Sequence, residues 1–286
     1  VYWNEEATTI PDTSKNLTLD LTVTQYSEQQ QDRPDIPEPS GKTEYAIGDE
    51  VYFDPVKGQR CYSDEAWTLD DKSRTCYKWN VIKTSDSSSD TVELLLDHDL
   101  PGQVEWVGLE DYKAAGGTDE EYNSTGTCYG PNDTSIPCGD NKYGPITALK
   151  HLKQGTDSWN GVVTLTSVDN VTRENSSGGN YTINYEGYKA RLISGQELAD
   201  IVGEPQIGYF DVPTWLYSNM AISADMSDMS DIDIYEHAAY WTDSAQSSHR
   251  SGAWVVRYAG DVYSILVSSA GGRGVRPVVK ILKSNL

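Results

Sequence analysis

The sequence has little positive charge and no long apolar run, and each scarcity narrows the class of protein. Its 286 residues include 22 Lys and Arg against 44 Asp and Glu, a formal net charge of −22. A surface this acidic repels nucleic acid and anionic lipid, so neither is expected as a partner. No apolar segment approaches the length of a membrane span, so we expect no membrane insertion.

Catalytic motifs are also missing. The chain contains no G-x-S-x-G, no H-E-x-x-H, no phosphate-binding loop and no dinucleotide-binding fingerprint. Carboxylates are so numerous that no pair stands out as a general acid and base. We therefore expect a protein that is not an enzyme, with no catalytic residues and no cofactor. Only two Phe accompany nineteen Tyr and eight Trp, and aromatic side chains with a polar group suit a β-rich, surface-exposed protein.

The four cysteines form two local pairs, Cys61 with Cys76 and Cys128 with Cys138. Neither pair has the C-x-x-C spacing of a zinc or redox site, and the four His are scattered. Two disulfides in an oxidising compartment are the favoured interpretation, with four free cytosolic thiols as the alternative. Because the chain starts at Val1 with no leader in view, we expect a mature secreted form located outside the cell.

Six N-x-S/T sequons occur in a chain that is rich in Asn, Ser and Thr, so several are expected by chance. They leave the glycosylation state open. The sequons are at Asn16, Asn123, Asn132, Asn170, Asn175 and Asn180.

A strict period-two pattern marks residues 16–24 (NLTLDLTVT). The apolar side chains of Leu17, Leu19, Leu21 and Val23 alternate with polar ones, which predicts a half-buried β-strand. Residues 25–42 follow as a polar, Pro-containing linker. A strand separated from its domain in this way must bury its apolar face against its own body or in the sheet of another copy. The second arrangement is donor-strand assembly, which would make the chain a fibre subunit.

Residues 43–286 predict one α+β domain dominated by sheet. A strand broken at Gly48 is expected over residues 44–53, and a hairpin over residues 75–83 and 91–96 with a polar tip. Residues 100–142 read as a long stapled loop region, and residues 205–240 as mixed and loop-rich.

Two short helices are expected between these loop regions. The first covers residues 146–153, and the second residues 194–202, with Ser194 and Glu197 forming a capping box and Gly203 as the stop. Beyond them the chain predicts a terminal hairpin over residues 253–267 and a last strand over residues 275–282.

The C-terminal hundred residues resemble a known fold family. Residues 189–198 (KARLISGQEL), 240–244 (YWTDS) and 274–278 (GVRPV) are similar to motifs of extracellular bacterial domains in the formylglycine-generating-enzyme-like branch of the C-type-lectin fold. The resemblance covers about residues 43–286 and implies a lectin-like fold. That family's activity uses a C-terminal cysteine pair, and this chain has no Cys after Cys138, so the activity is not carried over. We expect Arg276 to pair with a carboxylate or a carbonyl beneath the loops.

The N-terminal arm has a resemblance of its own. Residues 1–6 (VYWNEE) and 17–23 (LTLDLTV) are similar to the mature start of the TasA/camelysin group of secreted biofilm-fibre proteins, although Asn16 replaces that group's Gly. The resemblance covers about thirty residues, and the jelly-roll body of the group is not evident. It implies cleavage by a signal peptidase and assembly through N-terminal strands.

Two segments carry candidate ligand groups. Residues 241–250 (WTDSAQSSHR) would form an exposed loop in a lectin-like fold, where Trp241, His249 and Arg250 offer stacking and hydrogen-bonding groups. The alternative places Trp241 in the core, which we favour for that residue. Calcium is the one metal that the sequence suggests, because residues 225–233 place several Asp side chains in one segment. Their spacing is not that of an EF-hand, so a solvated acidic face is the preferred interpretation. The weak calcium candidates are Asp225, Asp228, Asp231 and Asp233.

Two functions follow from these features. The leading hypothesis is a secreted structural subunit of a bacterial filament, a pilus or biofilm fibre, whose partners are copies of itself. Leu17, Leu19, Leu21 and Val23 would be its polymerisation strand. The alternative is a monomeric cell-surface adhesion module of lectin-like type that binds a glycan or a protein through residues 241–250.

Overall fold

A computed structural model describes residue 36 and residues 41–124, 127–129, 135–220, 238–269, 271 and 273–286. For residues 127–129, 135 and 136 only the backbone is described. All of these residues belong to one compact unit, Ile36–Leu286. The N-terminal arm (1–24), nearly all of the linker (25–42) and the four calcium candidates lie outside the described residues. None of the helices described has the length and apolar character needed to cross a bilayer.

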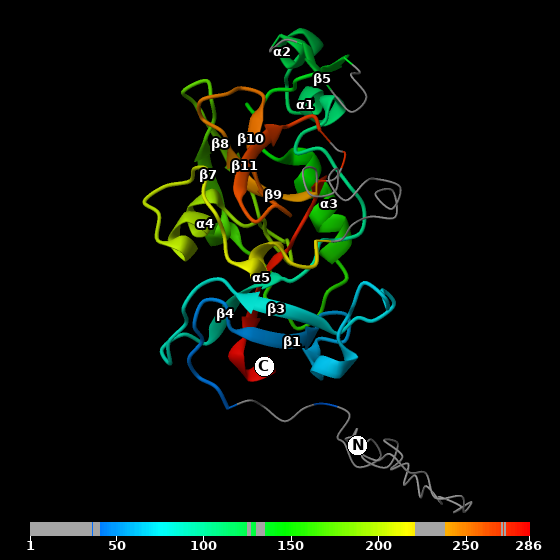
Figure 1. Cartoon of the computed structure of the whole chain (residues 1–286), viewed down its shortest axis with the longest axis vertical. Coiled ribbons are helices and arrows are strands. Elements are labelled where there is room, and N and C mark those ends of the chain that lie inside the picture. Colours follow the sequence, from blue (N-terminus) through cyan, green and yellow to red (C-terminus); the bar gives the residue numbers. More distant parts are fainter. Residues whose placement is uncertain are drawn as a thin grey trace, which may run out of the picture. The chain divides into compact units, whose positions relative to one another are not determined.

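The first sheet has five antiparallel strands in the order β13-β4-β3-β1-β2 (Figure 1). The predicted hairpin of residues 75–96 is confirmed as its centre, with Trp79 opposite Leu96. The predicted break at Gly48 is also confirmed, since its φ of +86° is a turn conformation that suits glycine. The strands are β1 (Glu50–Asp54), β2 (Gln59–Arg60), β3 (Tyr77–Val81), β4 (Thr91–Leu96) and β13 (Val278–Leu282).

The second sheet has four strands in the order β11-β10-β9-β12, of which β9 and β12 are parallel. The predicted terminal hairpin is confirmed as β10 and β11. Strand β9 corrects the prediction for residues 241–250, because its seven residues are all buried and only the residues after them form a loop. The strands are β9 (Ala239–Ala245), β10 (Gly252–Arg257), β11 (Val262–Leu266) and β12 (Arg273–Gly274).

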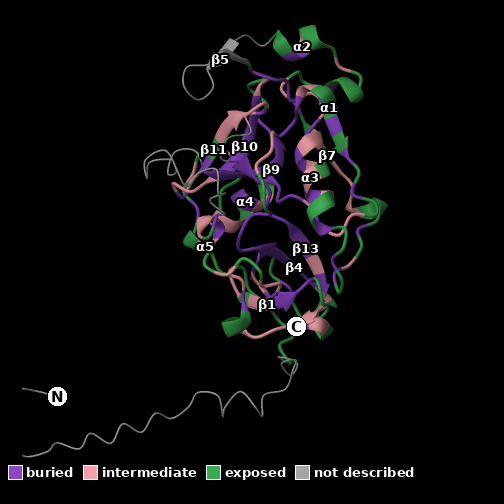
Figure 2. Cartoon of the chain, turned by 90° about the vertical axis from the view of Figure 1, so that its right-hand side faces the viewer, coloured by how far each residue is buried: buried purple, intermediate pink, exposed green. Residues whose placement is uncertain are grey.

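Both sheets bury side chains on two faces, which Figure 2 shows as purple strands between greener loops. In β9, Trp241 packs into the larger core with Trp79, whereas Tyr240 packs into a second core with Trp254. The chain passes from the second sheet to the first through residues 275–277, which lie between β12 and β13. Mainly antiparallel sheets accompanied by a few short helices are typical of an α+β body, and this coarse fold class agrees with the sequence.

The two predicted helices are confirmed, and three more are present in the described residues. Helix α4 (Gly195–Val202) has the predicted capping box of Ser194 and Glu197 and ends at the left-handed Gly203. Helix α3 (Ile146–Thr156) continues past its predicted end. The prediction of residues 100–142 as loop was wrong in part, because they contain two helices and a hairpin. Besides β2, β9 and β12, the elements that were not predicted include α1 (Leu109–Ala114), α2 (Asp119–Asn123), α5 (Thr214–Tyr217) and the hairpins β5 (Thr127–Tyr129)–β6 (Ser135–Pro137) and β7 (Val171–Glu174)–β8 (Asn180–Ile183).

The disulfide predictions are confirmed as far as the structure describes them. Cys61 and Cys76 are bonded, with a Cα–Cα distance of 5.8 Å. Cys138 is also disulfide-bonded. The side chain of its predicted partner, Cys128, lies outside the described part of the chain.

Candidate functional site

Two hollows, which we call the β9–β10 cleft, lie at the end of β9 and along the loop that follows it. The polar hollow has a volume of about 300 Å³, and its lining includes Arg173, Gln196 and Ser244. The apolar hollow, also of about 300 Å³, has Ile265 and Leu266 in its lining. A concave site of mixed character next to exposed aromatic rings is the usual form of a small-ligand pocket.

The side chain of Gln246 bonds residues on both sides of the cleft, Tyr209 and Ser264. Its side chain is 7% exposed, and its Nε2 donates to the hydroxyl of Tyr209 at 3.2 Å. Its Oε1 accepts a hydrogen bond from the hydroxyl of Ser264. A Cβ at Gly252 would lie 2.5 Å from Gln246 Oε1 and 2.8 Å from Ser264 Oγ, so this arrangement needs a residue without a side chain at position 252.

An aromatic cluster that combines a buried tryptophan with two exposed tyrosines borders the cleft. Tyr209 is 61% exposed, and its ring meets those of Trp254 and Tyr263 edge to face, at centroid distances of 5.2 and 5.3 Å. The guanidinium of Arg257 lies over the Tyr263 ring at 3.9 Å. Edge-to-face packing and a cation over a ring hold these aromatics in place while leaving Tyr209 accessible to a ligand.

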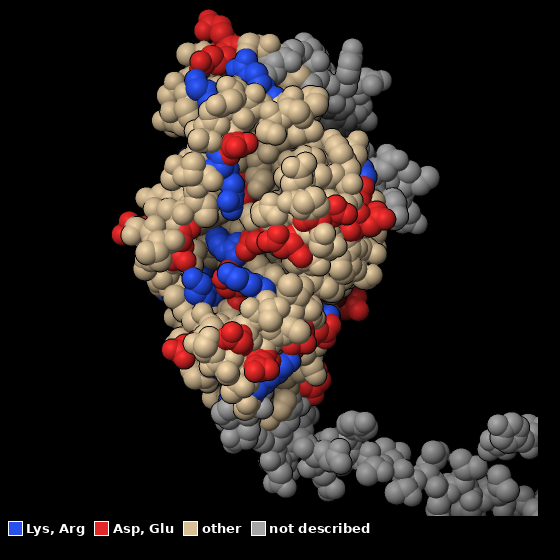
Figure 3. All heavy atoms as spheres, turned by 90° about the vertical axis from the view of Figure 1, so that its left-hand side faces the viewer, with Lys and Arg blue, Asp and Glu red and all other residues tan. Residues whose placement is uncertain are grey.

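The charge of Arg173 in the polar hollow is neutralised by the buried carboxylate of Asp243. Its Nε and Nη2 donate to both carboxylate oxygens of Asp243, at 3.0 and 2.8 Å. Asp243 is 1% exposed, and burial raises its pKa while the bonds from Arg173 and Ser244 oppose that rise. In Figure 3, Lys and Arg side chains run down the middle of the face that carries β7, β8 and α4, with Asp and Glu beside them. This face therefore shows mixed charges despite the acidity of the chain.

The structure places the three predicted ligand residues differently. Trp241 is fully buried, and its indole N–H donates to the carbonyl of Val104 at 2.8 Å, so as a ligand contact it was wrong and the core alternative holds. His249 is exposed and lines the apolar hollow, with its Nδ1 2.9 Å from Ser248 Oγ. Arg250 is ion-paired with Asp140 and does not belong to the lining of either hollow.

Sequence reasoning found part of the cleft, since residues of the predicted segment 241–250 line both hollows, but it missed the aromatic residues and the role of Gln246. Tyr209 lies in a stretch read as loop, and Gln246 and Trp254 carry no motif. Their roles depend on contacts between segments far apart in the chain, such as the 3.2 Å bond that joins Gln246 to Tyr209. The one usable signal was the number of Tyr and Trp, which points to exposed aromatics without saying where they lie.

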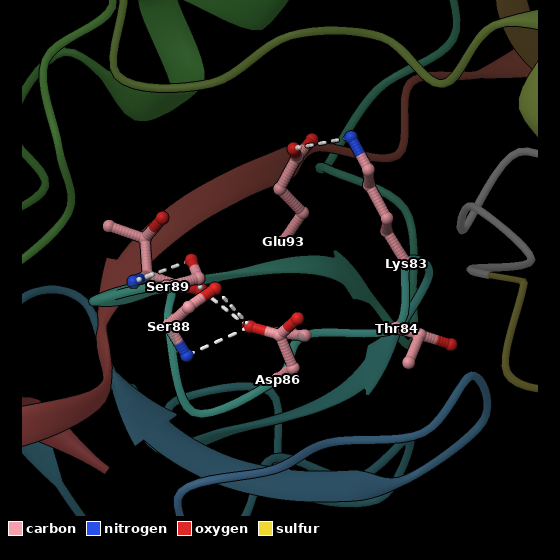
Figure 4. A pocket seen from close by; sticks show the side chains of 8 residues that line it. Lys83, Thr84, Asp86, Ser88, Ser89 and Glu93 are labelled. Carbon is pink, nitrogen blue, oxygen red and sulfur yellow. Dashed lines mark hydrogen bonds and ion pairs between the residues drawn. The ribbon is translucent and has the colours of Figure 1, made fainter.

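A third hollow, of about 310 Å³, lies at the β3–β4 turn (Figure 4). Figure 4 shows Lys83 and Glu93 on one rim and Asp86 with Ser88 on the other. Asp86 Oδ1 accepts from the backbone N–H and the hydroxyl of Ser88, which hold the pKa of that carboxyl below its ordinary value. Lys83 Nζ lies 4.0 Å from Glu93 Oε1. The lining has no aromatic side chain, so this hollow offers a ligand less than the β9–β10 cleft does.

Metal binding finds no support in the described residues. Nowhere in this part of the chain do three His, Cys, Asp or Glu side chains gather as metal ligands. The weak calcium candidates Asp225, Asp228, Asp231 and Asp233 lie outside it, so that prediction stays open.

Comparison with known proteins leaves the site to be judged on its own geometry. No family model, no curated protein and no solved structure matches the chain.

Proposed function

We propose that the chain is an extracellular binding module that holds a hydroxyl-rich ligand, a glycan, in the β9–β10 cleft. One observation carries the proposal: the exposed ring of Tyr209 lies beside a hollow lined by amide and hydroxyl side chains. Aromatic rings offer a flat apolar surface for the C–H face of a sugar, and amides both donate and accept bonds with its hydroxyls. Because Arg173 is already paired with Asp243, a neutral ligand can enter without separating that ion pair.

The secreted location is part of the same proposal. The Cys61–Cys76 disulfide and the disulfide of Cys138 suit an oxidising compartment. Disulfides persist mainly outside the cytosol, which is where a glycan-binding module would meet its ligand.

The C-type-lectin-like resemblance also remains a proposal, and the roles of its motif residues support it. Arg191 of the first motif bonds Glu197, six residues later, at 2.8 Å, and also bonds Glu93 of β4, almost a hundred residues earlier. Arg276 of the last motif bonds the buried Asp99 at 3.1 Å, as expected for that residue. Both arginines tie distant segments together, which gives a structural reason for these motifs independent of any ligand.

Glycan-array binding by the labelled full-length chain tests the function. We expect Tyr209→Ala to weaken the best hit by about tenfold or more, because an exposed aromatic anchor typically contributes over 1.4 kcal/mol to binding. Tyr209→Phe keeps the ring and loses only the bond to Gln246, so it should retain most of the affinity. Val168→Ala, at a residue that is 87% exposed in a separate turn, is the control.

Two results would contradict the glycan proposal. One is an array without hits for the unaltered chain at millimolar ligand. The other is an unchanged affinity of Tyr209→Ala, which would move the binding site elsewhere.

The filament subunit remains a second proposal, favoured by the alternation of Leu17, Leu19, Leu21 and Val23. Those residues lie outside the described part of the chain, so the pattern alone supports it. A donor strand of this kind would bury its aliphatic side chains in another copy, at roughly 1.5–3 kcal/mol for each full burial before the cost of ordering.

A further inference from the structure

Asn141 lies where three segments meet. It belongs to the stretch between β6 and α3, and it is completely buried. Its backbone N–H donates to the carbonyl of Arg250 at 2.6 Å. The residue is thus bonded through its main chain to the loop between β9 and β10, more than a hundred positions further along the chain.

The amide nitrogen of Asn141 holds that loop at three more points. Nδ2 lies 3.2 Å from the carbonyl oxygen of Gln246, 2.9 Å from that of His249 and 2.9 Å from that of Gly252. The loop therefore turns its acceptors inward around one donor group. A carboxylate of the same size would place negative oxygens against these carbonyls and would lose every one of these bonds.

The amide oxygen of Asn141 holds the opposite wall of the cleft. Oδ1 accepts from the hydroxyl of Ser176 at 3.1 Å and from its backbone N–H at 3.4 Å. Ser176 lies in the β7–β8 turn, directly after the strand that brings Arg173 and Glu174 to the polar hollow. One amide thereby spans two walls, with its oxygen toward β7–β8 and its nitrogen toward the β9–β10 loop.

The segment that carries Asn141 is itself constrained. Asp140 is ion-paired with Arg250 of the loop, and its Oδ1 accepts from the N–H of Lys142 at 2.9 Å. Cys138, three residues before Asn141, is disulfide-bonded. The backbone at Asn141 is therefore held in place, so its side chain can fix the separation between the β7–β8 hairpin and the β9–β10 loop.

We infer that Asn141 is a positioning residue of the β9–β10 cleft: it touches no ligand and fixes the loop of residues 246–252 against the β7–β8 hairpin. The ligand half of this inference rests on the proposed glycan function. The claim that Asn141 fixes the loop does not rest on that function, and it can be tested without any ligand.

Asn141→Asp in the full-length chain is the direct test, read by hydrogen exchange and mass spectrometry. The peptide covering residues 246–252 should exchange on the order of tenfold faster than in the unaltered chain, while β3 and β4 stay protected. Asn160→Asp is a matched control, because Asn160 Nδ2 also donates to two carbonyls, those of Val56 and Ser158, in a different loop. Unchanged exchange of residues 246–252 in Asn141→Asp would overturn the inference.

Affinity for the best array glycan is the second readout. We expect Asn141→Asp to lose on the order of tenfold and Asn160→Asp to keep full affinity. A loosened loop with unchanged affinity would mean that Asn141 is structural only, and would overturn its positioning role. If the unaltered chain binds no glycan, the proposed function and the ligand half fall together, whereas the loop exchange still decides the rest.

If Asn141→Asp does not fold, a measurement on the unaltered chain tests the same bonds. The side-chain amide protons of Asn141 should exchange at least about a hundredfold more slowly than those of Asn160, because only the former are buried. Equal rates, measured by NMR, would contradict the bonding described here.

Discussion

Among single residues, Arg276 is a charged side chain that the fold buries completely. Its guanidinium is fully buried, bonds Asp99 at 3.1 Å and the carbonyl of Leu216 at 2.9 Å, and lies 4.5 Å from the ring centre of Tyr240. Burial raises the pKa of Asp99, and the charge of Arg276 opposes that rise. Each charge is therefore tolerated in the interior because the other is present.

Removing one member of this pair should be costly. We expect Arg276→Met to lower the free energy of unfolding by about 3–5 kcal/mol, because it leaves the Asp99 carboxylate buried and unpaired. Urea unfolding at neutral pH measures the loss. The double variant Arg276→Met with Asp99→Leu should recover most of it. A loss below about 1 kcal/mol in the single variant would mean that the pair matters little.

Among the elements, α4 is fastened to the first sheet through its N-terminal turn. Arg191 bonds Glu197 of the capping box and also Glu93 of β4, so one side chain joins the helix to a strand. The start of the helix also contacts the cleft. The backbone N–H of Gly195 donates to the hydroxyl of Ser244, which lines the polar hollow, at 2.9 Å. The polar hollow thus depends on where this helix begins.

The capping box should make stability depend on pH in a defined direction. Burial raises the pKa of Glu197, but Arg191 and the bonds from Ser194 outweigh it, so the pKa lies below the ordinary value of 4.5. The unfolded chain therefore takes up the proton first, and this stabilisation is complete above pH 4.5 and is lost as the pH falls through the native pKa. We expect Glu197→Gln to lower the free energy of unfolding by about 2 kcal/mol at pH 7.

The difference in the free energy of unfolding between the unaltered chain and Glu197→Gln should become smaller below pH 4.5. Urea unfolding across pH 3–7 measures this difference. Glu186→Gln makes the same change at an exposed carboxylate and serves as the surface control. A gap that stays constant across this range would exclude the linkage.

Elements with a local signal were predictable, and the others were not. The α4 capping box and the β10–β11 hairpin could be read from spacing and turn residues alone. Strand β9 could not, because both its faces are buried and its sequence therefore lacks the alternation of a half-exposed strand. Helices α1 and α2, of six and five residues, are too short to repeat an apolar period. The cleft was foreseen only in part. Several residues of the predicted segment 241–250 line it, but Gln246, Tyr209 and Asn141 are brought together only by the tertiary fold.

At the scale of the whole molecule, deletion of residues 1–24 separates the two proposed functions. A filament subunit should stay folded and lose its ability to polymerise, whereas a binding module should keep its glycan affinity. Negative-stain microscopy and light scattering follow assembly, and the array follows binding. Fibres that persist after the deletion would exclude donor-strand assembly.

A finer pair of variants tests the same strand without removing it. Leu19→Asp with Leu21→Asp places charges on the apolar face and should abolish any fibres. Thr18→Ala with Thr22→Ala changes the opposite face and should leave them intact, because successive side chains of a strand point to opposite sides.

The first sheet receives both ends of the described body. Tyr45 pairs with Ser85 through two backbone bonds of 2.8 and 2.9 Å, and the ammonium group of Lys283, just after β13, donates to the carbonyl of Thr43 at 2.6 Å. A tensile force applied between residues 41 and 286 would therefore travel through the strands β1, β3, β4 and β13. The sheet that bears the cleft lies outside this series of strands, so tension between these two residues would not act directly on the cleft.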